Sequence, residues 1–413
     1  MALIPVAALS IVFFLIAARR VGGVRFHIWQ AMLFGALIVL FTGQISPSDA
    51  FKAVNMDVIL FLSGMFVVGS ALELSGYLSH LSYKSFKKAG SVDALVLLIL
   101  FGLGLASAFL MNDTCAIIGT PVVLALAGKY GIPPKLLLLT LAFAITLGSV
   151  PSPIGNPQNL LVAVNGGLES PFTAFLWFLF LPTLVNLFIA YLLLKFFYRE
   201  HFRRIPLNLS DEPVSDAGLA RLARISMILV VLLVLVKVSA VFLDRNLDYG
   251  LTYIALAAAL PLLVFSPRRR EILGKVDWST LVFFASMFVL MQSVWDSGFF
   301  QEVIEDAAMD ITTVPAIFMI SVGLSQLISN VPLVALYMPM LLHAGVSTKE
   351  LMALAAGSTI AGNLFILGAA SNVIIIQNAE KKGETLTFME FAKIGIPLTL
   401  VNILVYWLFL SIL

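Results

Sequence analysis

The 413-residue chain has little charge: acidic and basic side chains make up 12% of its residues, against about 25% in ordinary soluble domains. Hydrophobic residues make up 60%, and a soluble fold of this size has no room to bury that much apolar surface. These proportions exclude a soluble enzyme, a nucleic-acid-binding protein and a disordered chain. The net charge of +2 indicates no particular partner.

Cysteine is also scarce, and the motifs of several enzyme classes are missing. The one cysteine excludes a disulfide framework and a thiolate metal cluster. The four histidines have no metal-binding spacing, and the sequence has no G-x-x-x-x-G-K-[ST], Ser-His-Asp or H-E-x-x-H pattern. We therefore expect no enzyme activity, no cofactor, and neither ATP nor nucleic acid as a partner.

The sequence has instead long apolar runs of the length that a membrane helix needs. A bilayer core of about 30 Å needs roughly 20 apolar residues in a helix. Such runs lie near residues 2–18, 26–45, 56–76, 171–198, 220–243, 249–266, 277–297 and 390–412. Four further apolar segments are interrupted in their middle by polar, Gly or Pro residues: 94–128, 135–164, 312–343 and 349–379. The expected fold class is an all-α polytopic membrane protein.

The distribution of Lys and Arg predicts how these segments cross the membrane, because cytoplasmic loops are enriched in basic residues. We assume that segments 94–128 and 312–343 each enter and leave the membrane on the same side. Segments 135–164 and 349–379 are assumed to cross it. Then 21 of the 25 basic residues fall in inward loops, and three, Lys52, Arg245 and Lys349, fall in outward loops. We predict ten crossings of the cytoplasmic membrane, with both termini outside.

The two halves of the chain resemble each other. The matching pairs are Asn112…Pro121 with Asn330…Pro339, Gly155…Asn159 with Gly368…Asn372, and Pro182…Asn186 with Pro397…Asn402. Each half holds five crossings and one hairpin. Because five is an odd number, the second half begins on the opposite side of the membrane and lies inverted relative to the first. We expect inverted repeats over 1–198 and 220–413, joined by a cytosolic linker over 199–219. Inverted repeats with broken helices are typical of secondary transporters.

The interrupted segments 94–128 and 312–343 are predicted to be helical hairpins. Their tips, Asn112-Asp113-Thr114 and Ser329-Asn330, carry residues that cap the start of a second helix. The last arm, 331–343, has 13 residues and reaches about 20 Å, too short to span, which indicates a re-entrant hairpin. The arms of the first hairpin are long enough to cross, and only symmetry with the second favours re-entrance.

The interrupted segments 135–164 and 349–379 are predicted to be broken helices. Helix N-termini at such breaks favour anions, while released carbonyls and Asn or Ser side chains suit Na⁺. Asp113 adds a carboxylate for a cation or a proton, although it and the asparagines are alternatively helix caps. The expected substrate- and ion-binding residues are Asn112, Asp113, Thr114, Gly155, Asn156, Pro157, Asn159, Ser329, Asn330, Gly362, Asn363, Gly368, Ser371 and Asn372, with a Na⁺ site at Asn112, Asp113, Asn159, Asn330 and Asn372.

At these residues the chain resembles the ion transporter superfamily, which includes arsenite permeases, NhaD-type sodium/proton antiporters, citrate–metal symporters and divalent anion/sodium symporters. The tip Asn112-Asp113-Thr114 resembles the arsenite permease and NhaD-type pattern. Ser329-Asn330 resembles the Ser-Asn-Thr tip of the divalent anion symporters, with Val331 in place of Thr. Residues 155–159 resemble their Gly-Thr-Pro-Pro-Asn loop, with Asn for Thr and Gln for the second Pro.

The resemblance implies a scaffold domain and a transport domain that moves as an elevator, with sodium sites at the tips and broken loops, and often a homodimer. The first hypothesis is a secondary active transporter of a small anion or oxyanion, arsenite-permease-like, coupled to Na⁺ or H⁺ and working by alternating access in the lipid bilayer. The alternative is a sodium/proton antiporter of NhaD type. A third hypothesis is a passive channel or a subunit of a membrane complex.

Overall fold

The computed structural model describes most of the chain, and the described part is almost entirely helical. The described residues are 3–18, 20–21, 24–25, 27–77, 80, 89–202, 215–242, 251–299, 302 and 310–413. Most of the expected linker, 203–214, and several loops that carry the predicted charge bias lie outside these residues. A two-residue antiparallel ladder, β1 (Arg20–Val21) with β2 (Val24–Arg25), pairs Arg20 with Arg25.

The helices fall close to the predicted segments. In the first half they are α1 (Leu3–Ala18), α2 (Ile28–Phe41), α3 (Pro47–Ala53), α4 (Met56–Leu74), α6 (Val92–Leu97), the π-helix η1 (Leu98–Leu103), α7 (Gly104–Leu110), α8 (Asn112–Tyr130), α9 (Pro134–Ser149), α10 (Pro157–Asn165), α11 (Pro171–Phe197) and the 3-10 turn η2 (Arg199–His201). In the second half they are α12 (Ala217–Phe242), α13 (Leu251–Phe265), α14 (Arg269–Gly274), α15 (Trp278–Asp296), α17 (Val314–Ile328), α18 (Asn330–His343), α19 (Thr348–Ile360), the 3-10 turns η3 (Ala361–Asn363) and η4 (Ile366–Gly368), α20 (Ala370–Lys381) and α21 (Phe388–Ile412).

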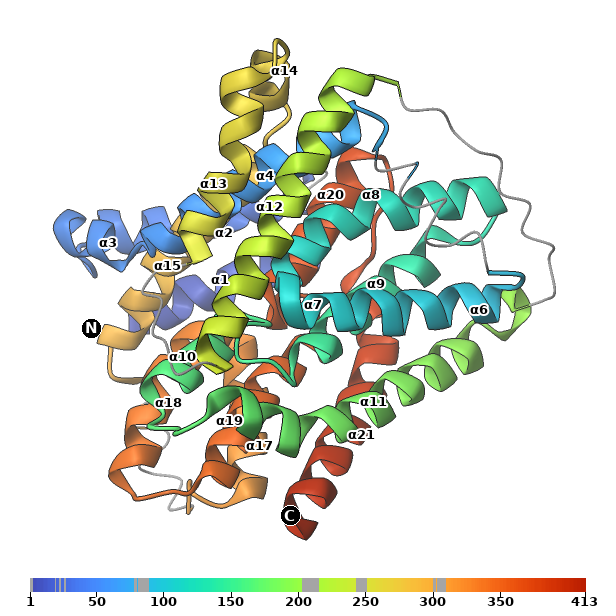
Figure 1. Cartoon of the computed structure of the whole chain (residues 1–413). Coiled ribbons are helices and arrows are strands. Elements are labelled where there is room, and N and C mark those ends of the chain that lie inside the picture. Colours follow the sequence, from blue (N-terminus) through green and yellow to red (C-terminus); the bar gives the residue numbers. More distant parts are fainter. Residues whose placement is uncertain are drawn as a thin grey trace.

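These helices pack as two groups. Bundle 1 comprises α1–α4 and α12–α15, in which α4 packs on α13, α12 on α13, and α15 on α2. Bundle 2 comprises α6–α11 and α17–α21, the hairpins and broken helices together with α11 and α21. Figure 1 shows α2, α3 and α13 on the left and α6, α9 and α11 on the right. The main contacts between the bundles are α4 with α8 and α12 with α7.

Both predicted hairpins are present, and their tips have the same backbone geometry. Hairpin 1 (α6–α8) turns at Met111, with φ 66° and ψ 147°, and hairpin 2 (α17 and α18) turns at Ser329, with φ 69° and ψ 160°. Among the described residues these two are the non-glycine residues with positive φ. A side chain is disfavoured there, so each tip holds a strained residue that the surrounding packing must maintain.

The arms of the hairpins differ in length. The 15 residues of α17 and the 14 of α18 reach about 22 and 21 Å, short of a bilayer core. The first arm of hairpin 1, Val92–Leu110, is a continuous 19-residue apolar helix and is long enough to cross. In the part of the chain that is described, three other helices share that property: Pro171–Phe197, Trp278–Asp296 and Phe388–Ile412. The ten crossings stay a prediction.

Both predicted broken helices are broken where expected. The first stops at Ser149 and restarts as α10 at Pro157. The second stops at Ile360, passes through η3 and η4, and restarts as α20 at Ala370. Proline and glycine in these stretches account for the interruption, because proline lacks an amide donor and glycine tolerates unusual backbone angles.

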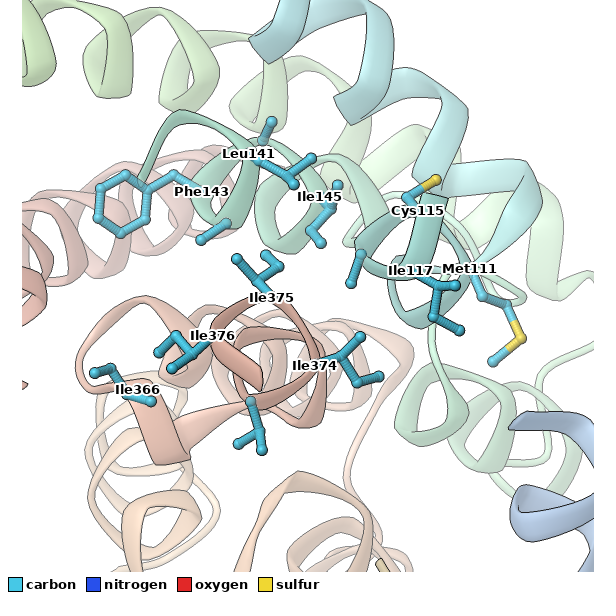
Figure 2. Close-up of a cluster of buried hydrophobic side chains, with 14 of the residues drawn as sticks. Met111, Cys115, Ile117, Leu141, Phe143, Ile145, Ile366, Ile374, Ile375 and Ile376 are labelled. Carbon is cyan, nitrogen blue, oxygen red and sulfur yellow. The ribbon is translucent and has the colours of Figure 1, made fainter. Parts of the chain in front are cut away.

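A continuous apolar core lies behind these breaks. Figure 2 shows Met111, Cys115 and Ile117 of hairpin 1 beside Ile145 of α9 and Ile374 of α20, all labelled within one cluster. Each of these side chains is buried. Packing of α8 and α9 against α20 therefore joins the first hairpin to both broken helices.

Two glycines allow a close helix contact in bundle 2. Helices α7 and α9 cross at Gly104 and Gly148, where a Cβ atom on Gly148 would lie 1.9 Å from the carbonyl oxygen of Gly104. No side chain fits there without separating the helices. Gly128 in α8 has nothing within 4 Å of its Cβ position and provides a matched control.

We predict that Gly148→Ala destabilises the protein by roughly 1–3 kcal/mol or more, because the methyl group forces α7 and α9 apart. Gly128→Ala is expected to be neutral or slightly stabilising, since alanine is the better helix former. Thermal unfolding of the detergent-purified variants measures both effects. Equal unfolding temperatures for the two variants would contradict the packing described here.

Candidate functional site

Four helix N-termini meet around one small cavity, the central cavity. Its bundle 2 lining comes from the first residues of α8, α10 and α18 and from the start of α20: Asn112, Asp113, Pro157, Gln158, Ser329, Asn330, Val331, Ala369 and Ala370. The tips of both hairpins therefore lie together with the restarted halves of both broken helices. Because the first amides of a helix have no intrahelical acceptor, these ends turn partial positive charge toward the cavity.

Bundle 1 closes the remaining side of the central cavity. Phe284, Met287 and Phe288, which lie on one face of α15, line it opposite the tips. The cavity therefore lies at the boundary between the two bundles. Its volume is about 30 Å³, enough for a water molecule or a small ion.

The tip of hairpin 1 is tied to the loop of the first broken helix. The amide of Asn112 donates to the carbonyl oxygen of Gly155 over 2.9 Å, and the Asn112 side-chain oxygen accepts from the amide of Asp113 over 2.8 Å. Asp113 is 4% exposed, and no basic side chain of the described residues lies next to its carboxylate. A buried carboxylate without a cation is costly unless a proton or a bound cation neutralises it.

Asn156 begins the restarted helix α10. Its side-chain oxygen accepts from the amide of Asn159 over 2.8 Å, which is the N-cap geometry. Its side-chain nitrogen lies within 3.1 Å of the Ser149 hydroxyl and 3.2 Å of the Thr359 hydroxyl. Asn156 therefore caps a helix and joins the two broken helices, and it does not line the central cavity.

Asn159 holds the interrupted loop together. Its side-chain nitrogen lies 3.3, 3.1 and 3.0 Å from the carbonyl oxygens of Ser149, Val150 and Ser152, and its side-chain oxygen accepts from the Thr359 hydroxyl over 3.1 Å. The carbonyls of Ser149 and Ser152 also accept the backbone amides of Ser152 and Gly155, whereas that of Val150 has no other donor among the described residues. The Asn159 side chain therefore holds this loop together and does not turn to the cavity.

At the second broken helix, amide side chains also donate to backbone carbonyl oxygens. The side chain of Asn372 donates to the carbonyl oxygen of Gly362 over 2.5 Å, and that of Gln326 donates to the carbonyl oxygen of Ala361 over 2.8 Å. Gly368 lies against this loop, since a Cβ atom there would be 2.4 Å from the same Ala361 oxygen. Amide side chains thus satisfy released carbonyls at both breaks.

Asn363 points to a second buried polar cluster. It donates to Asn402 over 3.1 Å, and Asn402 donates to Asn186 over 2.8 Å. The sequence pairs Asn186 with Asn402 as repeat equivalents, and the structure brings them into contact between α11 and α21. None of the three residues lines the central cavity, so Asn363 is placed with the helix contacts.

Several buried oxygens near the cavity have no hydrogen-bond partner among the described residues. They are the hydroxyl oxygens of Thr114 and Ser371 and the side-chain oxygens of Asn330 and Asn372. Hydroxyl and amide oxygens are ligands that a hard cation accepts. The described residues contain no cluster of three or more His, Cys, Asp or Glu side chains, so a transition-metal centre is not indicated there.

Of the residues expected from the sequence, Asn112, Asp113, Pro157, Ser329 and Asn330 line the central cavity. The cavity lining does not include the others, which are Thr114, Gly155, Asn156, Asn159, Gly362, Asn363, Gly368, Ser371 and Asn372. Sequence reasoning missed Gln158, Val331, Ala369, Ala370 and the apolar wall of α15. The i, i+3, i+4 spacing of Phe284, Met287 and Phe288 was the one available signal for that wall, but it also fits ordinary helix packing.

We predict that Asn159→Ala destabilises the fold by roughly 1–3 kcal/mol, because it leaves the buried carbonyl oxygen of Val150 without a donor among the described residues. Asn165→Ala, an exposed position at the end of the same helix, is the control and should leave the unfolding temperature unchanged. Thermal unfolding of both purified variants checks this. If Asn159→Ala unfolds at the parental temperature, the loop does not depend on this side chain.

The chain is similar to membrane proteins from distant organisms. It is 26% identical over 421 residues to the "46 kDa membrane protein" of Mycobacterium leprae, covering 98% of this chain and 96% of that protein. It is 29% identical over 440 residues to the silicon efflux transporter LSI3 of Oryza sativa, covering 89% of each. These alignments cover 98% and 89% of this chain, and so include both halves of it.

The fold has a counterpart among solved structures. The crystal structure of the YdaH transporter of Alcanivorax borkumensis aligns with a TM-score of 0.50 and 18% identity, covering 99% of this chain and 96% of that chain. At this identity the likeness shows the fold alone.

The match to a protein family is decisive. Residues 11–350 match the CitMHS family, described as citrate transporter. The resemblance to the ion transporter superfamily is thereby confirmed, as is the expectation that the protein is a membrane transporter and not an enzyme. The chain belongs to the CitMHS citrate transporter family.

Proposed function

We propose that the protein is a secondary active transporter that moves a small anion or oxyanion across the cytoplasmic membrane by alternating access. One observation carries this proposal: the N-termini of four helices, two from hairpin tips and two from broken helices, line a single cavity between two helix bundles. Helix N-termini bind anions through free amides without a buried Lys or Arg.

The size and chemistry of the central cavity support a small substrate. Its volume of about 30 Å³ suits a compact oxyanion or oxyacid better than the much larger citrate. The apolar wall of Phe284, Met287 and Phe288 offers no cation to a tricarboxylate. The rice relative is by its name a silicon efflux transporter, and silicon, like arsenic in arsenite and arsenous acid, forms compact oxygen compounds in water. We therefore favour arsenite and related oxyacids as substrates.

Coupling to Na⁺ or H⁺ is supported by the oxygens around the tips. The Asp113 carboxylate lines the cavity without a basic partner among the described residues, and the oxygens of Thr114, Asn330, Ser371 and Asn372 lack hydrogen-bond partners there. A proton on Asp113 or a Na⁺ among these oxygens would neutralise the buried carboxylate. The predicted Na⁺ ligands Asn112 and Asn330 lie at the cavity, whereas Asn159 already holds three carbonyls.

Alternating access requires two rigid parts and a site between them. Bundle 2 carries both hairpins and both broken helices, and bundle 1 supplies only the α15 wall of the cavity. We propose that bundle 1 is the scaffold and that bundle 2 moves against it as an elevator. The residues that match between 1–198 and 220–413 and the equal tip geometries support inverted repeats. With them we propose ten crossings, both termini outside, and a homodimer.

The test is uptake of arsenite into proteoliposomes under an imposed Na⁺ or H⁺ gradient. We expect Asp113→Asn to abolish gradient-driven accumulation, because the variant site no longer binds the coupling ion. Asp49→Asn, an exposed carboxylate in α3, should accumulate arsenite at the parental rate. Coupled uptake that survives Asp113→Asn would remove Asp113 from the mechanism, and a parental protein that moves no oxyacid would remove the substrate assignment.

The second candidate is a sodium/proton antiporter, and the isolated Asp113 carboxylate favours it. An antiporter needs a group that releases a proton when Na⁺ binds, and this carboxylate lies at the cavity with no competing basic group among the described residues. Pulses of Na⁺ or Li⁺ given to proteoliposomes loaded with a pH dye separate the two functions. Antiport predicts that protons move without any anion, and an oxyanion transporter predicts a flat dye signal until substrate is added.

A further inference from the structure

A second cavity lies between the bundles at the far end of α20. Its volume is about 340 Å³, and it is lined by His27, Trp29 and Gln30 at the start of α2, Ser279 at the start of α15, and Gln377, Glu380 and Lys381 at the end of α20. This cavity, the vestibule, is roughly ten times larger than the central cavity. The charge bias assigns this end of the protein to the cytosol.

The vestibule and the central cavity lie along the same two helices. On α15, Ser279 lines the vestibule and Met287 lines the central cavity, eight residues apart or about 12 Å along the axis. On α20, Gln377 and Ala370 line the same two cavities and are seven residues apart, about 10 Å. The boundary between α15 and α20 therefore leads directly from one cavity to the other.

Three consecutive residues at the end of α20 reach across this boundary to three different elements of bundle 1. The carboxylate of Glu380 lies 3.8 Å from His27, which caps α2. Lys381 pairs with Asp277 at 2.8 Å, and Lys382 pairs with Glu73 of α4 at 2.9 Å. Deeper in the vestibule, the Thr280 hydroxyl contacts the side-chain amide of Gln377.

Asp277 differs from the other partners because it is 4% exposed and fixed to its own helix. Its oxygens accept from the amide of Thr280 over 3.1 Å and from the Thr280 hydroxyl over 2.9 Å, so it caps α15. Lys381, by contrast, is nearly half exposed. If α20 moves away, Asp277 keeps its capping bonds and Lys381 returns to water, so the ion pair can break and reform without leaving an unsupported charge.

We propose that the vestibule is the cytosolic end of the solute path and that Asp277–Lys381, with Thr280–Gln377 behind it, forms a latch that holds the path closed. The solute class is a small hydrophilic oxyanion or oxyacid. This inference rests on the proposed function, since it gives bundle 2 a closed position against bundle 1.

The experiment measures access to the vestibule without measuring transport. In a Cys115→Ala background, Ser279→Cys places the sole cysteine in the vestibule wall. A membrane-impermeant cationic methanethiosulfonate is applied to inside-out and to right-side-out vesicles. We expect modification in inside-out vesicles and none in right-side-out vesicles. Modification from the outside alone would overturn the assignment of the path.

The latch is tested by adding Lys381→Met or Asp277→Asn to this reporter. Asparagine still caps a helix, so the second variant removes the charge and keeps the start of α15. We expect each variant to raise the modification rate about fivefold, the effect of losing one partly exposed ion pair. Lys275→Met, an exposed position after α14, should leave the rate unchanged.

The direction in which Lys381→Met and Asp277→Asn change the modification rate distinguishes a latch from a purely electrostatic effect on the reagent. Without a latch, removing the positive charge of Lys381 would speed modification by the cationic reagent, and removing the negative charge of Asp277 would slow it. Opposite effects of Lys381→Met and Asp277→Asn on the modification rate would therefore overturn the proposal. Unchanged rates for both would overturn it as well. Because the readout is modification, raised rates in a protein that moves no oxyacid would refute the proposed substrate while supporting the latch.

Discussion

The structure depends on how peptide groups are satisfied where helices break in an apolar environment. A released amide or carbonyl in a bilayer core has no water to bind, so each break needs side-chain partners or a ligand. The carbonyls at both breaks obtain amide side chains: Asn159 serves the first, and Asn372 with Gln326 serves the second. The starts of four helices line the central cavity, and the amides of Asn112, Asp113 and Asn159 among them already have acceptors. This division directs the anion-binding end of each half-helix to one place.

The same constraint explains why many buried polar side chains hold the fold together and do not face the cavity. Asn156, Asn159 and Thr359 join the two broken helices to each other, so that bundle 2 can behave as one body. Glycine also helps to hold bundle 2 together, because Gly104 and Gly148 let the backbones of α7 and α9 come into contact. A rigid bundle 2 and a sparse boundary with bundle 1 are the mechanical conditions for an alternating-access cycle. The ion pairs at the end of α20 lie on that boundary, where such a cycle would act.

The sequence predicted the helices, the two hairpins and the two breaks because these follow from local rules. Runs of about 20 apolar residues, capping residues and helix-breaking Pro and Gly act within a few positions of the chain. The start of α8 at Asn112 and the restart at Pro157 are examples, and both fall where they were expected. The family resemblance rested on the same short segments. The inverted orientation of the repeats and the ten crossings concern the membrane and stay predictions.

What the sequence determined by itself was therefore the set of breaks and the residue types that gather at them. Only the tertiary structure decided which of those residues face the cavity: Asn112 and Asn330 do, whereas Asn159 and Asn363 turn to carbonyls and to other helices. The physical reason is that capping, carbonyl binding and ligand binding use the same amide groups, so residue type does not distinguish them. The α15 wall and the contacts of Lys381 also join distant segments, and such contacts leave no local pattern to read.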